Sequence, residues 1–453
     1  MNPEPSLAAR WDNRALFGLL GPLVVEQILT VTMGAADTIM VSSVGEFAVS
    51  GVNIVDNINN LLIIAFSALC TGGAVVASQY IGRRDHANSS LAARQLVYIV
   101  MVISVFMALL AVLFRRRIIF LFYGNIETDV MAAASVYFLV TGLSYPFLAL
   151  YSANAALFRA AGNSRVPMRI AMLANVLNIG GNALFIYVFG LGAMGAALST
   201  LLCRMISAFI TTVMLNRDSD IPITLSGLFD VRIVRPMIRN ILNVGIPSGI
   251  ESSMFMIGKL LTQRIFAVFG TAAMAANAIA GVINSFSFMP GNAFGIALLT
   301  IVGQCAGAGD YGEAKKQTLK IMKLAYLTLA VISVFICAFM SPLIALFNLS
   351  PEARVMARSF LEVHCISMAV GWSMSFTLPN ALRAAGDARF VMIAATISMW
   401  TVRVSAAYFI TFTLGVGPLG VWLAMGADFL VRGTFYCTRW FRGKWLNKRV
   451  IAD

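Results

Sequence analysis

Twelve stretches of this chain are apolar and long enough to cross a lipid bilayer as helices, and this feature restricts the possible folds most strongly. A spanning helix needs about 20 consecutive apolar residues. The stretches run approximately over 14–40, 52–80, 94–114, 130–156, 169–189, 193–215, 240–268, 276–305, 319–341, 355–378, 391–413 and 418–437. Segments of about ten residues with alternating polarity, typical of membrane β-barrels, do not occur. Only 12% of the residues are charged, so the sequence predicts an all-α polytopic membrane protein.

The loops between these stretches alternate between short ones with little basic charge and longer, basic ones. Most of the 33 lysine and arginine residues lie in loops on the side of the N-terminus or in the C-terminal tail. Basic loops stay in the cytoplasm, so we expect a multi-pass protein of the inner (cytoplasmic) cell membrane with both termini cytoplasmic. The net charge of +13 then reflects topology. It does not indicate nucleic-acid binding, because no aromatic platform accompanies the basic residues.

The chain repeats itself at an almost constant interval. Pro22 and Glu26 correspond to Pro247 and Glu251, each 225 residues later, and "SQYIGRRD" corresponds to "GQCAGAGD" at the same interval. The motifs "LFRAAGNSR" and "ALRAAGDAR" are 224 residues apart. An interval that is kept across six spans predicts two related halves.

We place the two halves at residues 1–225 and 226–453, as an N-terminal and a C-terminal six-helix bundle. Six is an even number, so both halves begin on the cytoplasmic side and form parallel repeats about an axis along the membrane normal. Two such bundles with a central cleft between them are suited to alternating access. Since one chain contains both halves, we expect the protein to act as a monomer.

These motifs, in this order and with this duplication, resemble those of the multidrug and toxic compound extrusion (MATE) family, in its bacterial or archaeal type. The resemblance covers nearly the whole chain and includes "NVLNIGGNALFIYVFGLGAMGAALST" in the fifth and sixth spans. It implies a secondary active antiporter that exports cationic or amphiphilic drugs and toxic compounds in exchange for H+ or Na+. Small organic cations and the lipid bilayer are then its partners, and no cofactor is required.

Other functions are compatible with the architecture to different degrees. A flippase for lipid-linked sugars or lipids, from the same superfamily, would share the two-bundle arrangement and stays open as the alternative. A passive channel is disfavoured by the duplicated halves. The sequence contains no Walker motif, no nucleophile–base set, and no HExxH or CxxC spacing. We therefore expect no direct use of ATP, no enzyme activity and no structural metal.

A carboxylate inside an apolar span is costly, so Asp37 in "MGAADTIMVSSVGE" requires a function or a partner. In the fifth span, Asn178 and Asn182 are four residues apart on one helical face, with Asn175 on the same side. Carboxylate, amide and hydroxyl oxygens suit Na+, and a carboxylate can also carry a proton. The resemblance implies a cation site formed by Asp37, Asn178, Asn182 and Thr200, where some relatives have aspartate in place of Asn182. Alternatively, the asparagines only join helices through hydrogen bonds.

Two glutamates occupy equivalent places in the two halves. Glu26 and Glu251 each follow a proline by four residues, and proline removes a helical hydrogen bond and often bends the helix. We expect Pro22 and Pro247 to be helix hinges, and Glu26, Glu251 and Asn175 to take part in substrate binding or coupling. The alternative is that both glutamates pair with basic residues on other helices.

The C-terminal half departs from the family pattern at two positions. Many relatives carry a glutamate at the position of Phe255, and one branch carries an aspartate near the position of Trp372. Neither carboxylate is present in this chain. The resemblance therefore implies that the C-terminal acidic site of that branch is incomplete here.

Overall fold

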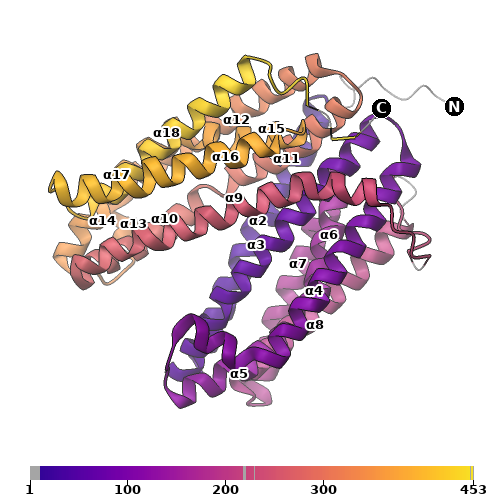
Figure 1. Cartoon of the computed structure of the whole chain (residues 1–453). Helices are drawn as coiled ribbons and strands as arrows, with labels where there is room; N and C mark the ends of the chain where they lie inside the picture. Colours follow the sequence, from indigo (N-terminus) through magenta and orange to yellow (C-terminus); the bar gives the residue numbers. More distant parts are fainter. Residues whose placement is uncertain (1–10, 218–220, 229, 449, 452–453) are drawn as a thin grey trace. The chain divides into compact units, whose positions relative to one another are not determined.

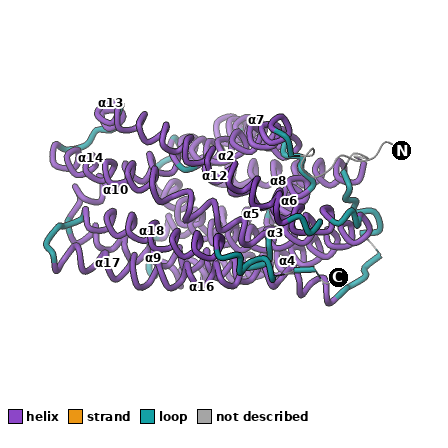
Figure 2. The backbone as a smooth tube through the Cα atoms, turned by 90° about the horizontal axis from the view of Figure 1, so that it is seen from above, coloured by secondary structure: helices purple, strands orange, loops and turns teal. Residues whose placement is uncertain are grey.

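The structure is a computed structural model that describes residues 11–217, 221–228, 230–448 and 450–451. These residues form helices joined by loops, with no strand among them (Figure 2). All twelve predicted spans lie in helical backbone, which confirms the predicted all-α fold.

The lengths and composition of the helices agree with a polytopic membrane protein. Among the described residues, eight helical segments are each long and apolar enough to cross a membrane, and a pair of helices bent by 47° adds up to a ninth. The predicted spans 240–268, 355–378 and 418–437 are helical as well. They contain charged side chains within the span or next to it, such as Glu251, Glu362 and Asp428.

The chain folds into two compact units, and the first comprises Phe17–Gly245. Its elements are α2 (Asn13–Ser42), α3 (Glu46–Gly82), α4 (His86–Tyr123), α5 (Thr128–Leu143), α6 (Tyr145–Ala160), α7 (Arg165–Asn182), the π-helical segment η1 (Ala183–Val188), α8 (Gly192–Arg217) and the first part of α9 (Arg235–Val268). Within this unit α3 packs against α4, α5 and α6, and α8 packs against α5, α6 and α7 (Figure 1).

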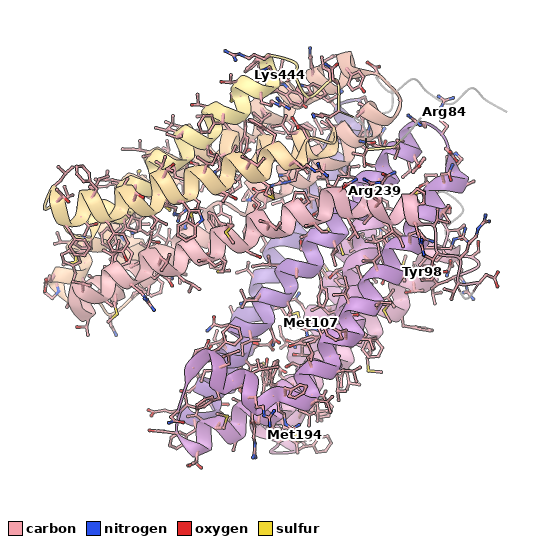
Figure 3. All side chains as sticks on the ribbon, in the orientation of Figure 1. Arg84, Tyr98, Met107, Met194, Arg239 and Lys444 are labelled. Carbon is pink, nitrogen blue, oxygen red and sulfur yellow. The ribbon has the colours of Figure 1, made fainter. Side chains whose placement is uncertain are left out.

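The N-terminal unit extends beyond residue 225 because the segment before α9 binds to α4. The hydroxyl of Tyr98, labelled in Figure 3, donates to the carbonyl of Leu228 at 2.7 Å. The amide of Gln95 donates to the carbonyl of Arg232 at 2.7 Å and accepts from the backbone N–H of Val234 at 3.0 Å. These hydrogen bonds fix the start of α9 in the first unit, as far as Gly245.

A close approach of two helices inside this unit depends on Gly72 of α3. A Cβ there would lie 2.9 Å from the backbone N of Gly245, and closer still to the carbonyl oxygen of Ile241. We expect Gly72→Ala to lower the free energy of unfolding by about 1–3 kcal/mol, because backbone atoms of α9 would have to move.

The matched control for this prediction is Gly34→Ala, since a Cβ at Gly34 on α2 would have no neighbour within 4 Å. Alanine favours the helix by about 1 kcal/mol over glycine, so this variant is expected to be neutral or slightly stabilised. Thermal unfolding followed by tryptophan fluorescence compares the two. Equal stability of both variants would contradict the close packing of α3 on α9.

The second unit comprises the chain from Ile246 onward, together with the described residues before Phe17. Its elements are the rest of α9, α10 (Gly270–Ser287), α11 (Met289–Gly307), α12 (Tyr311–Ala338), α13 (Met340–Ala345), α14 (Pro351–Ser367), η2 (Met368–Thr377), α15 (Leu378–Ala384), α16 (Ala388–Ser398), η3 (Met399–Val404), α17 (Ser405–Tyr408), η4 (Phe409–Thr413) and α18 (Leu419–Phe441). Stacked rings of Phe360 and Trp422, with centroids 5.9 Å apart, join α14 to α18 in its core.

The loops after α3 and α11, which correspond in the sequence repeat, contain the same side-chain hydrogen bond. The side chain of Asp85 accepts a hydrogen bond from the backbone N–H of Asn88 at 3.0 Å, and that of Asp310 accepts one from Glu313 at 2.9 Å. Each aspartate is therefore the N-cap of the helix that follows. The hydrogen bonds from Asn88 hold the pKa of Asp85 below its usual value.

The backbone leaves α-helical geometry at related places in the two units. The segment η1 begins directly after Asn182, and η4, in the second unit, corresponds to it at the repeat interval. A π-helical turn is rare and often occurs at functional sites. In the first unit it directly follows a residue that the sequence predicts to bind a cation.

Candidate functional site

Asp37 on α2 meets the two asparagines of α7 that the sequence places on one helical face. The Nδ2 of Asn182 donates to Asp37 Oδ1 at 2.5 Å and lies 3.5 Å from Oδ1 of Asn178. Both asparagine side chains are fully buried. The structure thus brings together three of the four residues predicted to bind a cation.

The fourth residue, Thr200, is buried on α8, which packs against α7. Its neighbour Ser199 donates to the carbonyl of Asn178 at 2.9 Å and joins the two helices. Within the described residues, Thr200 Oγ1 and Asn182 Oδ1 have no hydrogen-bond partner. Buried oxygens normally have one, so these two oxygens are available to a ligand.

The chemistry of these side chains limits which ions they can bind. The described part of the chain contains no group of three or more His, Cys, Asp or Glu side chains that could hold a metal ion. A cation at Asp37 would therefore be bound by one carboxylate together with amide and hydroxyl oxygens. Such hard oxygen ligands suit an alkali cation, and the carboxylate alone suits a proton.

Asn175, predicted on the same face of α7, has a different partner. Its Nδ2 donates to the carbonyl of Ala171 on its own helix at 2.9 Å. Its Oδ1 is buried, and no described residue donates to it. No hydrogen bond between Asn175 and Asp37 is found among the described residues. Asn175 is therefore not part of the hydrogen-bonded cluster of Asp37, Asn178 and Asn182.

The first unit contains a further carboxylate within a span, Asp56, which was not among the predicted site residues. Asp56 on α3 accepts hydrogen bonds from Asn59 Nδ2 and from the hydroxyl of Tyr137, both at 3.2 Å. The hydroxyl of Tyr145 donates in turn to Asn59 Oδ1 at 2.7 Å. The signal that identified Asp37, a carboxylate within an apolar span, is also present in "GVNIVDNINN" and would have found Asp56.

The two glutamates occupy equivalent ion pairs in the two units. Glu26 Oε1 lies 2.7 Å from Nη1 of Arg159, and Glu251 Oε2 lies 2.6 Å from Nη2 of Arg383. All four side chains are less than one-fifth exposed. The arginines belong to the duplicated "FRAAG" and "LRAAG" motifs, so the repeat preserves the partner as well as the glutamate.

The prolines that precede these glutamates lie inside continuous helices. Pro22 is within α2, and Pro247 is within α9. Each removes one helical hydrogen bond without ending the helix. Both positions therefore keep the property that the hinge prediction requires, a weakened turn next to a charged side chain.

The remaining basic residues within the spans have other partners. Arg204 donates to the hydroxyl of Ser144 at 2.6 Å. Arg432 lies 3.3 Å from Asp428, one helical turn earlier on the same helix, and Arg403 lies 3.9 Å from the same carboxylate. Asp428 is fully buried and also accepts a hydrogen bond from Ser398 at 2.6 Å.

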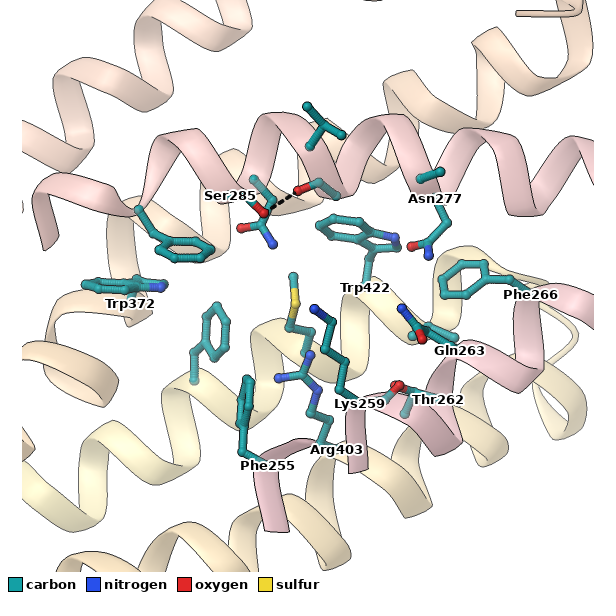
Figure 4. A pocket seen from close by; sticks show the side chains of 18 of the residues that line it. Phe255, Lys259, Thr262, Gln263, Phe266, Asn277, Ser285, Trp372, Arg403 and Trp422 are labelled. Carbon is teal, nitrogen blue, oxygen red and sulfur yellow. Dashed lines mark hydrogen bonds between the residues drawn. The ribbon is translucent and has the colours of Figure 1, made fainter. Parts of the chain in front are cut away.

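The second unit contains a cavity of about 470 Å³ within its own helices. Phe255, Lys259, Thr262 and Phe266 line it from one face of α9, as their helical spacing requires. Figure 4 shows Lys259 and Arg403 directed into this space, which is also lined by amide side chains of α10 and by the rings of several aromatic residues.

Both positions at which the chain departs from the family pattern are part of this cavity. Phe255 and Trp372 are among its lining residues, and no aspartate or glutamate is. The guanidinium of Arg403 lies 5.0 Å from the centre of the Phe255 ring. The cavity is therefore aromatic and cationic where the resemblance would place carboxylates.

Comparison with known proteins agrees with the fold and with the repeat. A family model described as MatE matches residues 22–184 and again residues 247–409, so the two matched segments begin and end 225 residues apart. The Bacillus subtilis protein named "Uncharacterized transporter YisQ" is 30% identical over 96% of this chain and 95% of its own length. A protein named "Probable multidrug resistance protein NorM" from Thermotoga maritima is 28% identical over 97% and 94%.

Solved structures show the same architecture. A crystal structure of MATE in the bent conformation has a TM-score of 0.89 to this chain, with 19% sequence identity and 96% of both chains covered. At this identity the comparison shows the shared fold. Together with the family match, it accounts for the two six-helix repeats.

Proposed function

The chain belongs to the MATE family of membrane transporters, and from this we propose that it exports amphiphilic organic compounds, organic cations among them, in exchange for H+ or Na+. The observation that carries the proposal is the part-buried hydrogen bond between Asp37 and Asn182, together with buried oxygens of Asn182 and Thr200 that have no partner among the described residues. A site with one carboxylate and neutral oxygens can alternate between an occupied, neutral state and an empty, charged state.

The exchange requires only that each ligand binds one conformation better than the other. We propose that a proton or Na+ binds at Asp37, Asn178, Asn182 and Thr200, and that this occupancy changes the conformation of α2 near Pro22. The compound is released on the outer side of the inner membrane. The transporter then returns to its inward-facing conformation with the ion bound. One chain contains both repeats, so a monomer suffices for this cycle.

Glu26 and Glu251 are proposed to couple the exchange through their ion pairs with Arg159 and Arg383. Each pair joins a helix that contains proline to the motif after the fourth or tenth span. A substrate or a proton that competes for the glutamate would release that connection. Pro22 and Pro247 are the proposed hinges, and Asn175 is proposed to assist substrate binding next to the cation site.

The test is efflux of ethidium from liposomes that contain the purified protein, with the membrane potential clamped. A pH gradient and a Na+ gradient are imposed separately, each directed opposite to the movement of the dye. Acceleration by the pH gradient alone identifies proton exchange, and acceleration by the Na+ gradient alone identifies Na+ exchange. If neither gradient accelerates efflux, ion-coupled export is wrong, and flipping of fluorescent lipid analogues would then test the flippase alternative.

A further inference from the structure

We propose that the cavity in the second unit is a binding site for an organic anion, a carboxylate, sulfonate or phosphate group attached to an aromatic or aliphatic body. This ligand class goes beyond the proposed exchange of amphiphiles for H+ or Na+. The proposal concerns only contacts within the second unit, between α9, α10, η2, η3 and α18.

The charge of the cavity favours an anion. Lys259 and Arg403 both line the cavity, whereas none of its lining residues is acidic. No ion pair to Lys259 is found among the described residues. Lys259 is exposed, whereas Arg403 is only 6% exposed and lies 3.9 Å from Asp428. A buried cation without a close counter-ion is costly, and an anion in the cavity would lower that cost at Arg403 and pair with Lys259.

The nearest carboxylate cannot neutralise both cations. Asp428 is fully buried and is not among the residues that line the cavity, with Arg432 at 3.3 Å and Ser398 donating to it at 2.6 Å. Arg403 is more distant from it, at 3.9 Å. One carboxylate therefore faces two arginines, and Lys259 adds a third positive charge. Of these three cations, Lys259 and Arg403 line the cavity and Arg432 does not.

Hydrogen-bond donors without partners also favour an anion. Arg403 is only 6% exposed, and its Nε and Nη1 have no hydrogen-bond partner among the described residues. The indole Nε1 of Trp422, which is 5% exposed, also lacks one there. Arginine and indole nitrogens only donate hydrogen bonds. A ligand that satisfied them must supply acceptors, as an anionic oxygen does and an organic ammonium group does not.

The shape of the cavity suits a ligand with a flat apolar body. Trp372 stacks on Phe288 with ring centroids 5.9 Å apart, and Phe255 and Phe376 meet edge to face at 5.8 Å. These rings form a wall for a flat apolar body. A volume of about 470 Å³ lies in the range of drug-sized binding sites. The anionic group would lie at Lys259 and Arg403, and the body against the rings.

The experiment uses 8-anilinonaphthalene-1-sulfonate as probe and the full-length protein in nanodiscs of zwitterionic lipid. The fluorescence of the probe is excited by energy transfer from tryptophan, since Trp372 and Trp422 line the cavity. The signal from empty nanodiscs is subtracted. The matched ligand is N-phenyl-1-naphthylamine, which has the same rings without the sulfonate. We expect the anion to bind at least about tenfold more tightly than its uncharged analogue.

The variants test whether the preference arises in the cavity. Lys259→Met is expected to weaken binding of the anion about tenfold and to leave the uncharged analogue unchanged, whereas Lys259→Arg retains the preference. Arg264→Met is the control, because Arg264 is an exposed cation of the same helix outside the cavity lining. Equal affinity for both ligands in the wild-type protein, or an unchanged affinity in Lys259→Met, would overturn the proposal.

Competition identifies the source of the anion. Displacement of the probe by soluble 2-naphthoate assigns the site to free organic anions, and displacement only by phosphatidylglycerol in the nanodisc assigns it to a lipid headgroup. Displacement by neither rejects the site. The measurement uses no ion gradient, so its failure would leave the proposed antiport intact. Conversely, an Asp37 variant that has lost gradient-driven efflux should bind the probe as tightly as the wild-type protein does.

Discussion

Asp37→Asn is expected to reduce gradient-driven efflux to the level of empty liposomes while the protein stays folded. Asparagine has nearly the same shape and can keep the contact with Asn182, which now measures 2.5 Å. It cannot carry a proton, and it offers a cation no negative charge. The coupling step is therefore lost, whereas removal of a half-buried charge does not by itself destabilise the fold.

Three measurements make this result specific. Thermal unfolding of Asp37→Asn should match that of the wild-type protein. Exchange of labelled against unlabelled ethidium without a gradient should persist, because the cargo can still bind. The matched control is Asp85→Asn, a carboxylate replaced in a loop, where asparagine is an equally good N-cap and efflux should continue. Efflux by Asp37→Asn at the wild-type rate would remove Asp37 from the mechanism.

The second large effect is expected on stability. Arg383→Met leaves Glu251 without its partner at 2.6 Å, and the two side chains are only 14% and 12% exposed. Removing one member of a buried ion pair costs about 3–5 kcal/mol, because the other charge stays buried and uncompensated. Thermal unfolding should show a marked loss of stability. The double variant Glu251→Gln with Arg383→Met should recover most of it.

The control for this effect is an exposed ion pair in the same unit. Arg358 lies 3.1 Å from Glu362, with side chains 63% and 53% exposed. Such a pair contributes at most about 1 kcal/mol, so Arg358→Met should unfold almost as the wild-type protein does. A similar small effect for Arg383→Met would show that the pair of Glu251 and Arg383 is not buried in the working protein.

The double variant also separates the two roles considered for Glu251. If the glutamate only joins helices, a stable double variant should transport normally. If it couples the exchange, the same variant should be stable and yet impaired in gradient-driven efflux. The equivalent pair of Glu26 and Arg159 in the first unit gives an independent repetition of this comparison.

Several features of the site could be predicted from spacing along one helix. Asn178 and Asn182 share a face because they are one helical turn apart, and the structure places both near Asp37. The pairing of Asp428 with Arg432 follows the same rule. Asp56 could have been found by the same signal as Asp37, a carboxylate in an apolar run, but its partner Tyr137 lies on another helix.

Other contacts could not be predicted, because they join residues that are far apart in the sequence. Glu26 and Arg159 are 133 residues apart, and Glu251 and Arg383 are 132 apart. The spans also contain other basic residues, among them Arg204 and Arg403, and the sequence does not distinguish these from Arg159 and Arg383 as partners of the glutamates. In the structure Arg204 donates a hydrogen bond to Ser144, and Arg403 lines the cavity.

The sequence by itself determined the helical membrane fold, the duplicated halves and the family, because hydropathy and a repeat interval are properties read along the chain. Only the tertiary structure decided which charges on different helices meet. The ion pair of Glu251 with Arg383 and the cavity that contains Lys259 depend on how α9 packs against distant helices. Electrostatic interactions act over a few ångströms in space, so helix packing sets the charge that a ligand meets.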